Sequence, residues 1–278
     1  ASLLGEKVGH TVGYQVRQDS CVSKQTKILV VTEGILTRKL QSDPELYDTA
    51  LVIFDEFHER SLHADLSLAL CLQSQQILRE ELKILVMSAT LNTDAIARLL
   101  SAGSESDDFP IIISKGRSYP VEVHYLHHSI KSGDRNQLIS ALSSTCRQVI
   151  EEHDDNCLVF LPGIREITLL QEQLASYLKD TGNKNIMIAP LFGNLSKQQQ
   201  DAAIAPPPAG MRKFVLANNI ADTSITIDGI SCVIDSGLER VLEYSAASAM
   251  NQLRTQSISV DSAEQRSGRA GRLSAGHC

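Results

Sequence analysis

The sequence of 278 residues lacks tryptophan and has no excess of basic residues, since its net charge at neutral pH is −7. A global positive field that would attract nucleic acid is therefore excluded, and any site for a polyanion has to be built locally. No apolar run is long enough to cross a membrane, and the first residues lack the pattern of a secretory signal. We therefore expect no membrane partner.

Cysteine is scarce as well: the six cysteines are scattered, and no two of them form a Cys-x-x-Cys pair. Most lie in apolar segments, where they are expected to be small core residues. This usage is typical of a protein that stays reduced, and it predicts a cytoplasmic location. The sequence begins without methionine and ends abruptly at "SAGHC", so we expect it to be a fragment of something longer.

Short apolar runs alternate with amphipathic stretches along the whole chain. Expected strands lie at residues 27–31, 50–54, 83–87, 109–113, 121–126, 157–161, 185–191, 213–217 and 231–235, and expected helices at 59–79, 134–152, 164–180 and 196–204. Near-continuous apolar strands separated by helices predict an α/β fold with parallel sheets covered on both faces.

Polar residues at 101–109 and 115–120 interrupt this alternation, which then resumes. The break predicts two domains of similar plan, residues 1–115 and residues 116–278, with a cleft between them. Within the second domain, residues 238–258 place two strand-like segments around a turn of small residues. This pattern predicts a β-hairpin.

The segment "LVIFDEFHERSL" places two acids, Asp55 and Glu56, directly after an apolar strand. Ligands of α/β sheets bind at the carboxyl ends of strands. An aspartate there can hold Mg²⁺ through water, and a neighbouring glutamate can take a proton from an attacking water. The alternative is an ion-paired turn with Arg60, and the spacing alone leaves both open.

Two further segments carry residues suited to a phosphate ligand. "SAT" (88–90) directly follows the expected strand at 83–87, just as Asp55 and Glu56 directly follow the expected strand at 50–54. "QRSGRAGR" (265–272) places three arginines and a glutamine among small residues. Guanidinium groups match phosphate oxygens, and glycine lets a backbone approach a ligand closely. The alternative for "QRSGRAGR" is a solvated basic loop.

Taken together, the motifs resemble those of superfamily 2 helicases of the DEAH/RHA group, and most closely the bacterial HrpB type. The segments that carry the resemblance occur in the order of that family: "DEFH" (55–58), "SAT" (88–90), "LVFLPG" (158–163), "ADTSITIDG" (221–229) and "QRSGRAGR" (265–272). The resemblance covers essentially the whole chain. It implies two RecA-like domains in tandem, the first without its N-terminal strand, and an ATP-dependent helicase that translocates on single-stranded RNA or DNA.

The resemblance also implies roles at a site for ATP and Mg²⁺. Asp55 matches the acid that holds Mg²⁺ through water, Glu56 the general base, and His58 the residue that links the nucleotide site to the second domain. In that second domain, Gln265 matches the residue that positions water, and Arg269 and Arg272 match the arginines that reach the γ-phosphate. Positions near the nucleotide ribose are matched by Thr226 and Asp228.

Further matches concern coupling and the nucleic acid strand. Ser88 and Thr90 match the motif that couples hydrolysis to domain movement. Strand-contacting positions, which in this family touch mainly the backbone, are matched by Thr32 in "TEGIL", Ser196 at the end of "FGNLS", and Thr223. The predicted hairpin matches the strand-separating hairpin of the family.

Three positions depart from the usual family pattern. Phe57 replaces alanine, as it does in the HrpB type. Asn218 stands where threonine is usual, and Asp222 where glutamate is usual. Because the aspartate side chain is one methylene group shorter, we expect a weaker contact to the strand.

One element that nucleotide hydrolysis requires has no counterpart in the sequence. The phosphate loop G-x-x-x-x-G-K-S/T supplies backbone amides, a lysine and a hydroxyl for the phosphates and Mg²⁺, and no segment fits it. We therefore expect the chain as given to lack ATPase activity. The rival interpretations are a non-catalytic nucleic-acid-binding module and, more remotely, a Mg²⁺-dependent hydrolase of another substrate.

Histidines cluster in "VEVHYLHH", where His124, His127 and His128 resemble metal ligands in type. At the end of a strand, however, surface or interface histidines are the more common case. The acidic segment "EEHDD" (151–155) is expected to be a solvated helix end.

The predicted domain boundary can be tested by limited proteolysis, because exposed polar linkers are cleaved first. We expect the first cut between residues 101 and 120, with two products that match the two predicted domains in mass. A first cut elsewhere, with this segment protected, would show that the boundary is wrong.

Overall fold

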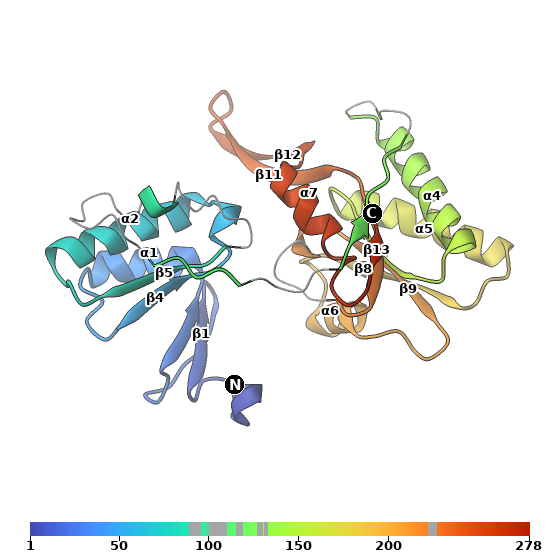
Figure 1. Cartoon of the computed structure of the whole chain (residues 1–278). Coiled ribbons are helices and arrows are strands. Elements are labelled where there is room, and N and C mark those ends of the chain that lie inside the picture. The colour runs from blue at the N-terminus through green and yellow to red at the C-terminus, as the bar shows by residue number, and fades with distance from the viewer. Residues whose placement is uncertain are drawn as a thin grey trace. The chain divides into compact units, whose positions relative to one another are not determined.

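The computed structural model of the chain describes residues 1–88, 96–98, 100, 110–114, 119–126, 130, 133–221 and 227–278. The chain divides into two compact units, Ala1–Ile113 and Ser114–Cys278 (Figure 1). Within the described part of the chain, no helix combines the length and the apolar character needed to cross a membrane.

Among its described residues, the first unit forms two small sheets and the two longer helices α1 and α2. One sheet has the order β2-β1-β3 and the other pairs β4 with β5 in parallel. The elements are η1 (Ser2–Leu4), β1 (Val12–Val16), β2 (Asp19–Cys21), β3 (Ile28–Val31), α1 (Glu33–Ser42), β4 (Leu51–Phe54), η2 (Phe57–Glu59), α2 (Leu62–Ile77) and β5 (Lys83–Val86).

Burial alternates along β4, so that only one face of the β4–β5 pair is covered by described residues. Val52 and Phe54 are buried in a core with Leu68 of α2, whereas Leu51 and Ile53 are 44% and 50% exposed. The expectation of a sheet covered on both faces is therefore wrong for this unit, as far as the structure describes it.

The second unit is built on a six-stranded sheet in which every pair is parallel. Its strand order is β6-β13-β10-β7-β9-β8. The elements are β6 (Val121–Glu122), α4 (Arg135–Glu152), β7 (Asn156–Phe160), α5 (Ile164–Asp180), β8 (Ile186–Leu191), α6 (Lys197–Ile204), β9 (Arg212–Ala217), η3 (Asn219–Ala221), β10 (Ile230–Asp235), β11 (Leu238–Ser245), β12 (Met250–Ser257), α7 (Val260–Ser267) and β13 (Gly276–His277).

Both faces of this sheet are covered, which explains its continuous apolar strands. Successive residues of β7 point to opposite faces: Val159 belongs to the core under α4 and α5, and Leu158 and Phe160 belong to the core that includes Ala203 of α6. The mixed α/β class with a parallel sheet, predicted from the alternation of runs, is thus confirmed.

Lys213 of β9 is buried beside the C-terminal end of α6, where it donates hydrogen bonds to backbone carbonyls. Its ammonium group donates hydrogen bonds to the carbonyls of Ala202 and Ala203, both at 3.1 Å, and to that of Ala205. The last carbonyls of a helix have no partner within the helix. Desolvation lowers the pKa of Lys213, but the three carbonyls give the charged form its partners.

Several predicted elements differ from the structure. Of the strand expected at 109–113, residue 109 lies outside the described residues and residues 110–113 form no strand. The strand expected at 121–126 covers only Val121–Glu122. The hairpin is present as β11 and β12, paired antiparallel from Leu238↔Ser257 to Ser245↔Met250. Helices α1 and α7 were not predicted, because Gly34 and the polar residues of 260–267 weaken their apolar period.

All six cysteines are free, and four of them (Cys71, Cys146, Cys157 and Cys232) are buried. Burial raises the pKa of the Cys71 thiol to about 12 and that of the half-buried Cys278 to about 11.

Because the thiolate is the reactive form, we expect Cys21 to react first with a disulfide reagent near pH 8 in the native protein. All six thiols should react after denaturation. Mass spectrometry of the labelled peptides would identify the site, and rapid native labelling of Cys157 or Cys146 would contradict the buried positions of these residues.

Candidate functional site

Asp55 and Glu56 follow β4 directly, at the carboxyl edge of the β4–β5 pair. The Met87 N–H donates to the Phe54 carbonyl at 2.8 Å, and the Phe57 N–H donates to the Met87 carbonyl at 3.0 Å. These two bonds extend the pairing beyond both strands. They bring the segment that contains Asp55, Glu56 and His58 next to Ser88, while Thr90 lies outside the described residues.

The backbone of Glu56 is left-handed, with a φ of 49°. Such a conformation is uncommon for residues other than glycine and is costly unless the surroundings fix it. Here the flanking residues do so, because the Glu56 N–H donates to Asp55 Oδ1 at 2.9 Å and the next residue is bound to Met87. The turn leaves Asp55 exposed and Glu56 half-buried.

His58 lies beside the glutamate, with its Nε2 3.4 Å from Glu56 Oε2. Its side chain is only 9% exposed, whereas that of Glu56 is 43% exposed. The imidazole can therefore orient the carboxylate without shielding it from solvent.

Phe57 explains how two acids remain at the end of a core strand. Its ring is buried and meets Phe54 edge to face, with ring centroids 6.1 Å apart. The aromatic side chain anchors the turn in the core of the first unit, while the neighbouring carboxylates stay at its surface.

The ion-paired turn that was the alternative interpretation is not formed with Arg60. That guanidinium donates twice to Asp65, from Nε and Nη2 at 3.0 Å each, and so pairs along the chain with the start of α2.

Thr32 is exposed at the carboxyl end of β3 and is the N-cap residue of α1. The next residue, Glu33, accepts a hydrogen bond from Ser61, which caps α2 by accepting from the Ala64 N–H. In the interior of the same helix pair, the hydroxyls of Thr37 and Ser67 lie 2.9 Å apart. The start of "TEGIL" is thereby fixed to the end of "DEFHERS".

In the second unit, the first arginine of "QRSGRAGR" is a buried structural residue. Arg266 is 1% exposed and donates to Asp235 Oδ1 at 3.0 Å and to the Leu238 carbonyl at 3.3 Å. Its guanidinium also lies 4.8 Å from the centroid of the Phe160 ring. The interpretation of this segment as a solvated basic loop is therefore wrong.

The other residues of this motif lie on α7 and the turn after it. Arg269 is 8% exposed, and Arg272 is exposed. The Gln265 side-chain amide nitrogen is buried without a hydrogen-bond partner among the described residues. It can therefore donate a hydrogen bond to a ligand or a water molecule. Gly271 is required by packing, since a Cβ there would lie 2.5 Å from the Tyr119 carbonyl oxygen.

The remaining predicted residues have separate positions. Ser196 caps α6 in a capping box with Gln199, so its hydroxyl already has a structural task. Asp228 is exposed in the turn before β10. Thr223 and Thr226 lie outside the described residues.

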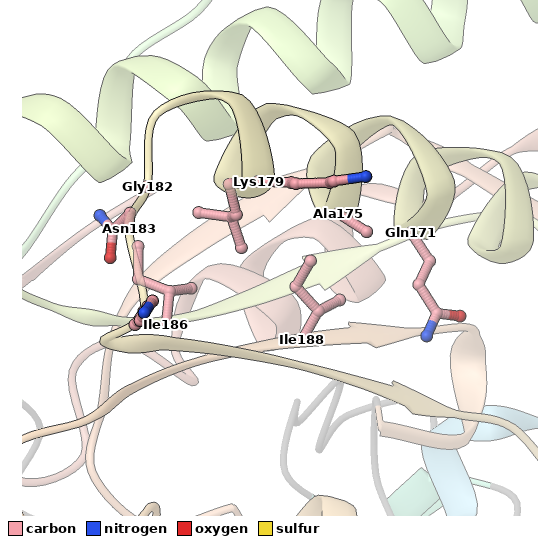
Figure 2. Close-up of a pocket in the computed structure, with 9 residues that line it drawn as sticks. Gln171, Ala175, Lys179, Gly182, Asn183, Ile186 and Ile188 are labelled. Carbon is pink, nitrogen blue, oxygen red and sulfur yellow. The ribbon is translucent and has the colours of Figure 1, made fainter.

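A hollow of about 460 Å³ lies between α5 and β8 (Figure 2). It is lined by Gln171, Ala175, Leu178, Lys179, Gly182, Asn183, Lys184, Ile186 and Ile188. The two lysines are its only ionisable groups, and it contains none of the residues predicted from the motifs.

Two family models match the chain: the DEAD/DEAH box helicase at residues 3–99 and the helicase conserved C-terminal domain at residues 141–274. The ATP-dependent RNA helicase HrpB of Escherichia coli (strain K12) is 47% identical over 276 residues, which are 99% of this chain and 32% of the relative. The ATP-dependent RNA helicase HrpA of Borreliella burgdorferi is 34% identical over 278 residues, which are 100% of this chain and 32% of the relative. The chain thus spans about a third of the length of these relatives.

Solved structures agree with the sequence comparison. The crystal structure of the E. coli DExH-box NTPase HrpB matches with a TM-score of 0.83 at 46% identity, over 100% of this chain and 32% of the other. A second crystal structure, of the E. coli DEAH/RHA helicase HrpB, matches with a TM-score of 0.85 at 47% identity, over 99% of this chain and 34% of the other.

The buried position of Arg266 predicts that its loss destabilises the protein. In Arg266→Met the Asp235 carboxylate keeps its largely buried position without a cation, which typically costs about 3–5 kcal/mol. Urea unfolding followed by circular dichroism would measure the change. The matched control is Arg254→Met, which removes an exposed pair with Glu243 and should leave the midpoint almost unchanged. Equal midpoints for both variants would show that Arg266 is not structural.

Proposed function

The chain belongs to the DEAD/DEAH box helicase family, and from this membership we propose that it is the core of an ATP-dependent RNA helicase that moves along a single strand. The observation that carries the proposal is the pair Asp55 and Glu56, presented to solvent at the carboxyl edge of β4 and β5. The similar proteins of E. coli and B. burgdorferi are both named ATP-dependent RNA helicases, which favours RNA over DNA as the strand.

Asp55 is the residue proposed to hold Mg²⁺. The ion usually keeps several waters and binds proteins through one or two carboxylates, so one exposed aspartate at a strand end suits it. Bound there, Mg²⁺ would neutralise charge on the phosphates of ATP.

Glu56 is the proposed general base, because its half-exposed carboxylate can take a proton from water. His58 is proposed to hold that carboxylate in place, as their separation of 3.4 Å allows.

The second unit is proposed to supply charge and water positioning for the same reaction. The segment formed by α7 and the turn after it contains Gln265, Arg269 and Arg272. The buried side-chain amide of Gln265 can donate a hydrogen bond to a ligand or water. Arginine is suited to this role because its planar fork stays charged and matches phosphate oxygens. Thr226 and Asp228 are proposed near the nucleotide, and Ser88 with Thr90 in coupling.

Contacts to the nucleic acid strand are proposed for Thr32, Ser196 and Thr223. The exposed position of Thr32 supports its assignment. Ser196 is the weakest of the three, because its side chain is engaged in the capping box of α6.

The chain as given is proposed to lack ATPase activity, because its sequence contains no G-x-x-x-x-G-K-S/T segment. The alternative proposal is that the chain in isolation is a nucleic-acid-binding module without catalytic activity. A cytoplasmic location is proposed from the free cysteines, which suit a reducing compartment.

The role of Glu56 is testable in a longer form of the protein that contains a phosphate loop. Glu56→Gln keeps the shape of the side chain but cannot accept a proton, so ATP binding should persist and strand-stimulated turnover should fall about 10²–10⁴-fold. Glu59→Gln is the matched control, because Glu59 is an exposed acid three residues away and should retain full turnover. Unchanged phosphate release by Glu56→Gln would show that Glu56 is not the general base.

A further inference from the structure

Three histidines and two carboxylates gather at one edge of the six-stranded sheet, remote in sequence from the acids after β4. Among the described residues they form two overlapping groups of potential metal ligands: His153, Asp155 and His277, and Glu122, His124 and His277. In each group the three ligand atoms lie within 4.8 Å of one another.

The topology of the sheet creates this cluster from three distant segments. His153 is the C-cap residue of α4, and Asp155 lies in the short connection from α4 to β7. His277 lies on β13, which pairs with β10 on one side and with β6 on the other. Glu122 is directly opposite His277, and the His124 N–H donates to the Cys278 carbonyl at 2.7 Å.

The rings lie close to one another and to the carboxylates of the cluster, since His124 Nε2 is 3.6 Å from Glu122 Oε1. The centroids of His153 and His277 are 5.1 Å apart, and those of His124 and His277 are 6.4 Å apart. His153 Nδ1 lies 4.0 Å from Asp155 Oδ2, which exceeds a hydrogen bond. Small side-chain rotations would bring these atoms to the roughly 2.0–2.2 Å from a common centre that zinc ligands adopt.

The carboxylate of Asp155 is held in a fixed orientation. Ser231 on β10 donates a hydrogen bond to Asp155 Oδ1, and the other carboxylate oxygen, Asp155 Oδ2, faces His153 Nδ1. The neighbouring cation, Arg212, donates to the backbone carbonyls of Val149, Ile150 and Asp155 and lies 3.8 Å from Asp154 Oδ1, and it makes no ion pair with the Asp155 carboxylate. The Asp155 carboxylate is therefore not neutralised by an ion pair with Arg212.

We propose that this cluster binds one transition-metal ion of the Zn²⁺ class, through His153, Asp155 and His277, with His124 or Glu122 in the fourth position. Imidazole nitrogens with a carboxylate are ligands of Zn²⁺ and its neighbours, whereas Mg²⁺ and Ca²⁺ prefer oxygen alone. The half-buried positions of the first three residues leave the site open to exchange with solvent.

Cys278, the next residue after His277, is not part of the site. Its side chain packs against the core that contains Leu158 and Phe160, and burial raises its thiol pKa to about 11. Successive residues of an extended segment point to opposite sides, which separates this thiol from the His277 ring.

Such an ion would join the two short strands β6 and β13 to the connection between α4 and β7. Each strand has only two residues, so the backbone pairing of this edge is weak by itself. Because β13 begins four residues after the end of "QRSGRAGR", metal binding would stabilise the chain around the turn that contains Arg269 and Arg272. The proposal does not depend on the proposed helicase function.

The test is calorimetric titration of the metal-free chain with Zn²⁺, together with the absorption spectrum of the Co²⁺ form. We expect one ion per chain, a higher midpoint of thermal unfolding with Zn²⁺, and no displacement by millimolar Mg²⁺. The Co²⁺ spectrum should lack a thiolate charge-transfer band.

Variants separate the site from adventitious binding. Ser231→Ala removes only the hydrogen bond that orients Asp155, and should weaken binding about 10- to 100-fold. His153→Gln and Asp155→Asn remove ligands and should weaken it further, with circular dichroism confirming that both fold. His63→Gln changes an exposed histidine of the first unit and should have no effect. The proposal is overturned by absence of saturable binding, by a thiolate band, or by unchanged affinity in both ligand variants.

Discussion

The buried guanidinium of Arg266 fixes the end of the second unit on which the motif residues stand. It joins α7 to the carboxyl end of β10 through Asp235, to the start of β11 through the Leu238 carbonyl, and to the end of β7 through the Phe160 ring. A buried charge of this kind is tolerated only with its full set of partners. The orientation of α7, and with it the positions of Gln265 and the following arginines, depends on this one side chain.

A backbone constraint has the same effect in the first unit. The two hydrogen bonds of Met87 continue the β4–β5 pairing past the strands and force the chain to turn at Glu56, where φ is positive. The buried ring of Phe57 then anchors the turn from below. In the first unit, Asp55 and Glu56 stand at the carboxyl end of a parallel strand, where ligands of α/β sheets bind, and their apolar neighbours Phe54 and Phe57 hold the backbone in the core.

The sequence predicted the α/β class, the helices α4 and α5 nearly to the residue, and the hairpin, because long apolar periods and turn residues report on burial. It did not predict α7, whose one buried residue is an arginine, nor that Arg266 is buried while Arg272 is exposed, because charge alone does not reveal burial. The sequence analysis favoured a surface position for His124 and a solvated helix end for His153 and Asp155, because only the parallel order β6-β13-β10 shows that these residues lie beside His277.

Phosphate release by residues 1–278 tests the proposal that Asp55, Glu56, Arg269 and Arg272 belong to a helicase ATPase whose phosphate cradle this chain lacks. The assay contains Mg²⁺, ATP and single-stranded RNA, beside a longer form that has the phosphate loop. Positioning and charge stabilisation dominate phosphoryl transfer, so the account predicts strand-stimulated turnover by the longer form alone. Strand-stimulated turnover by residues 1–278, lost in Glu56→Gln, would contradict it and place the nucleotide elsewhere on the chain.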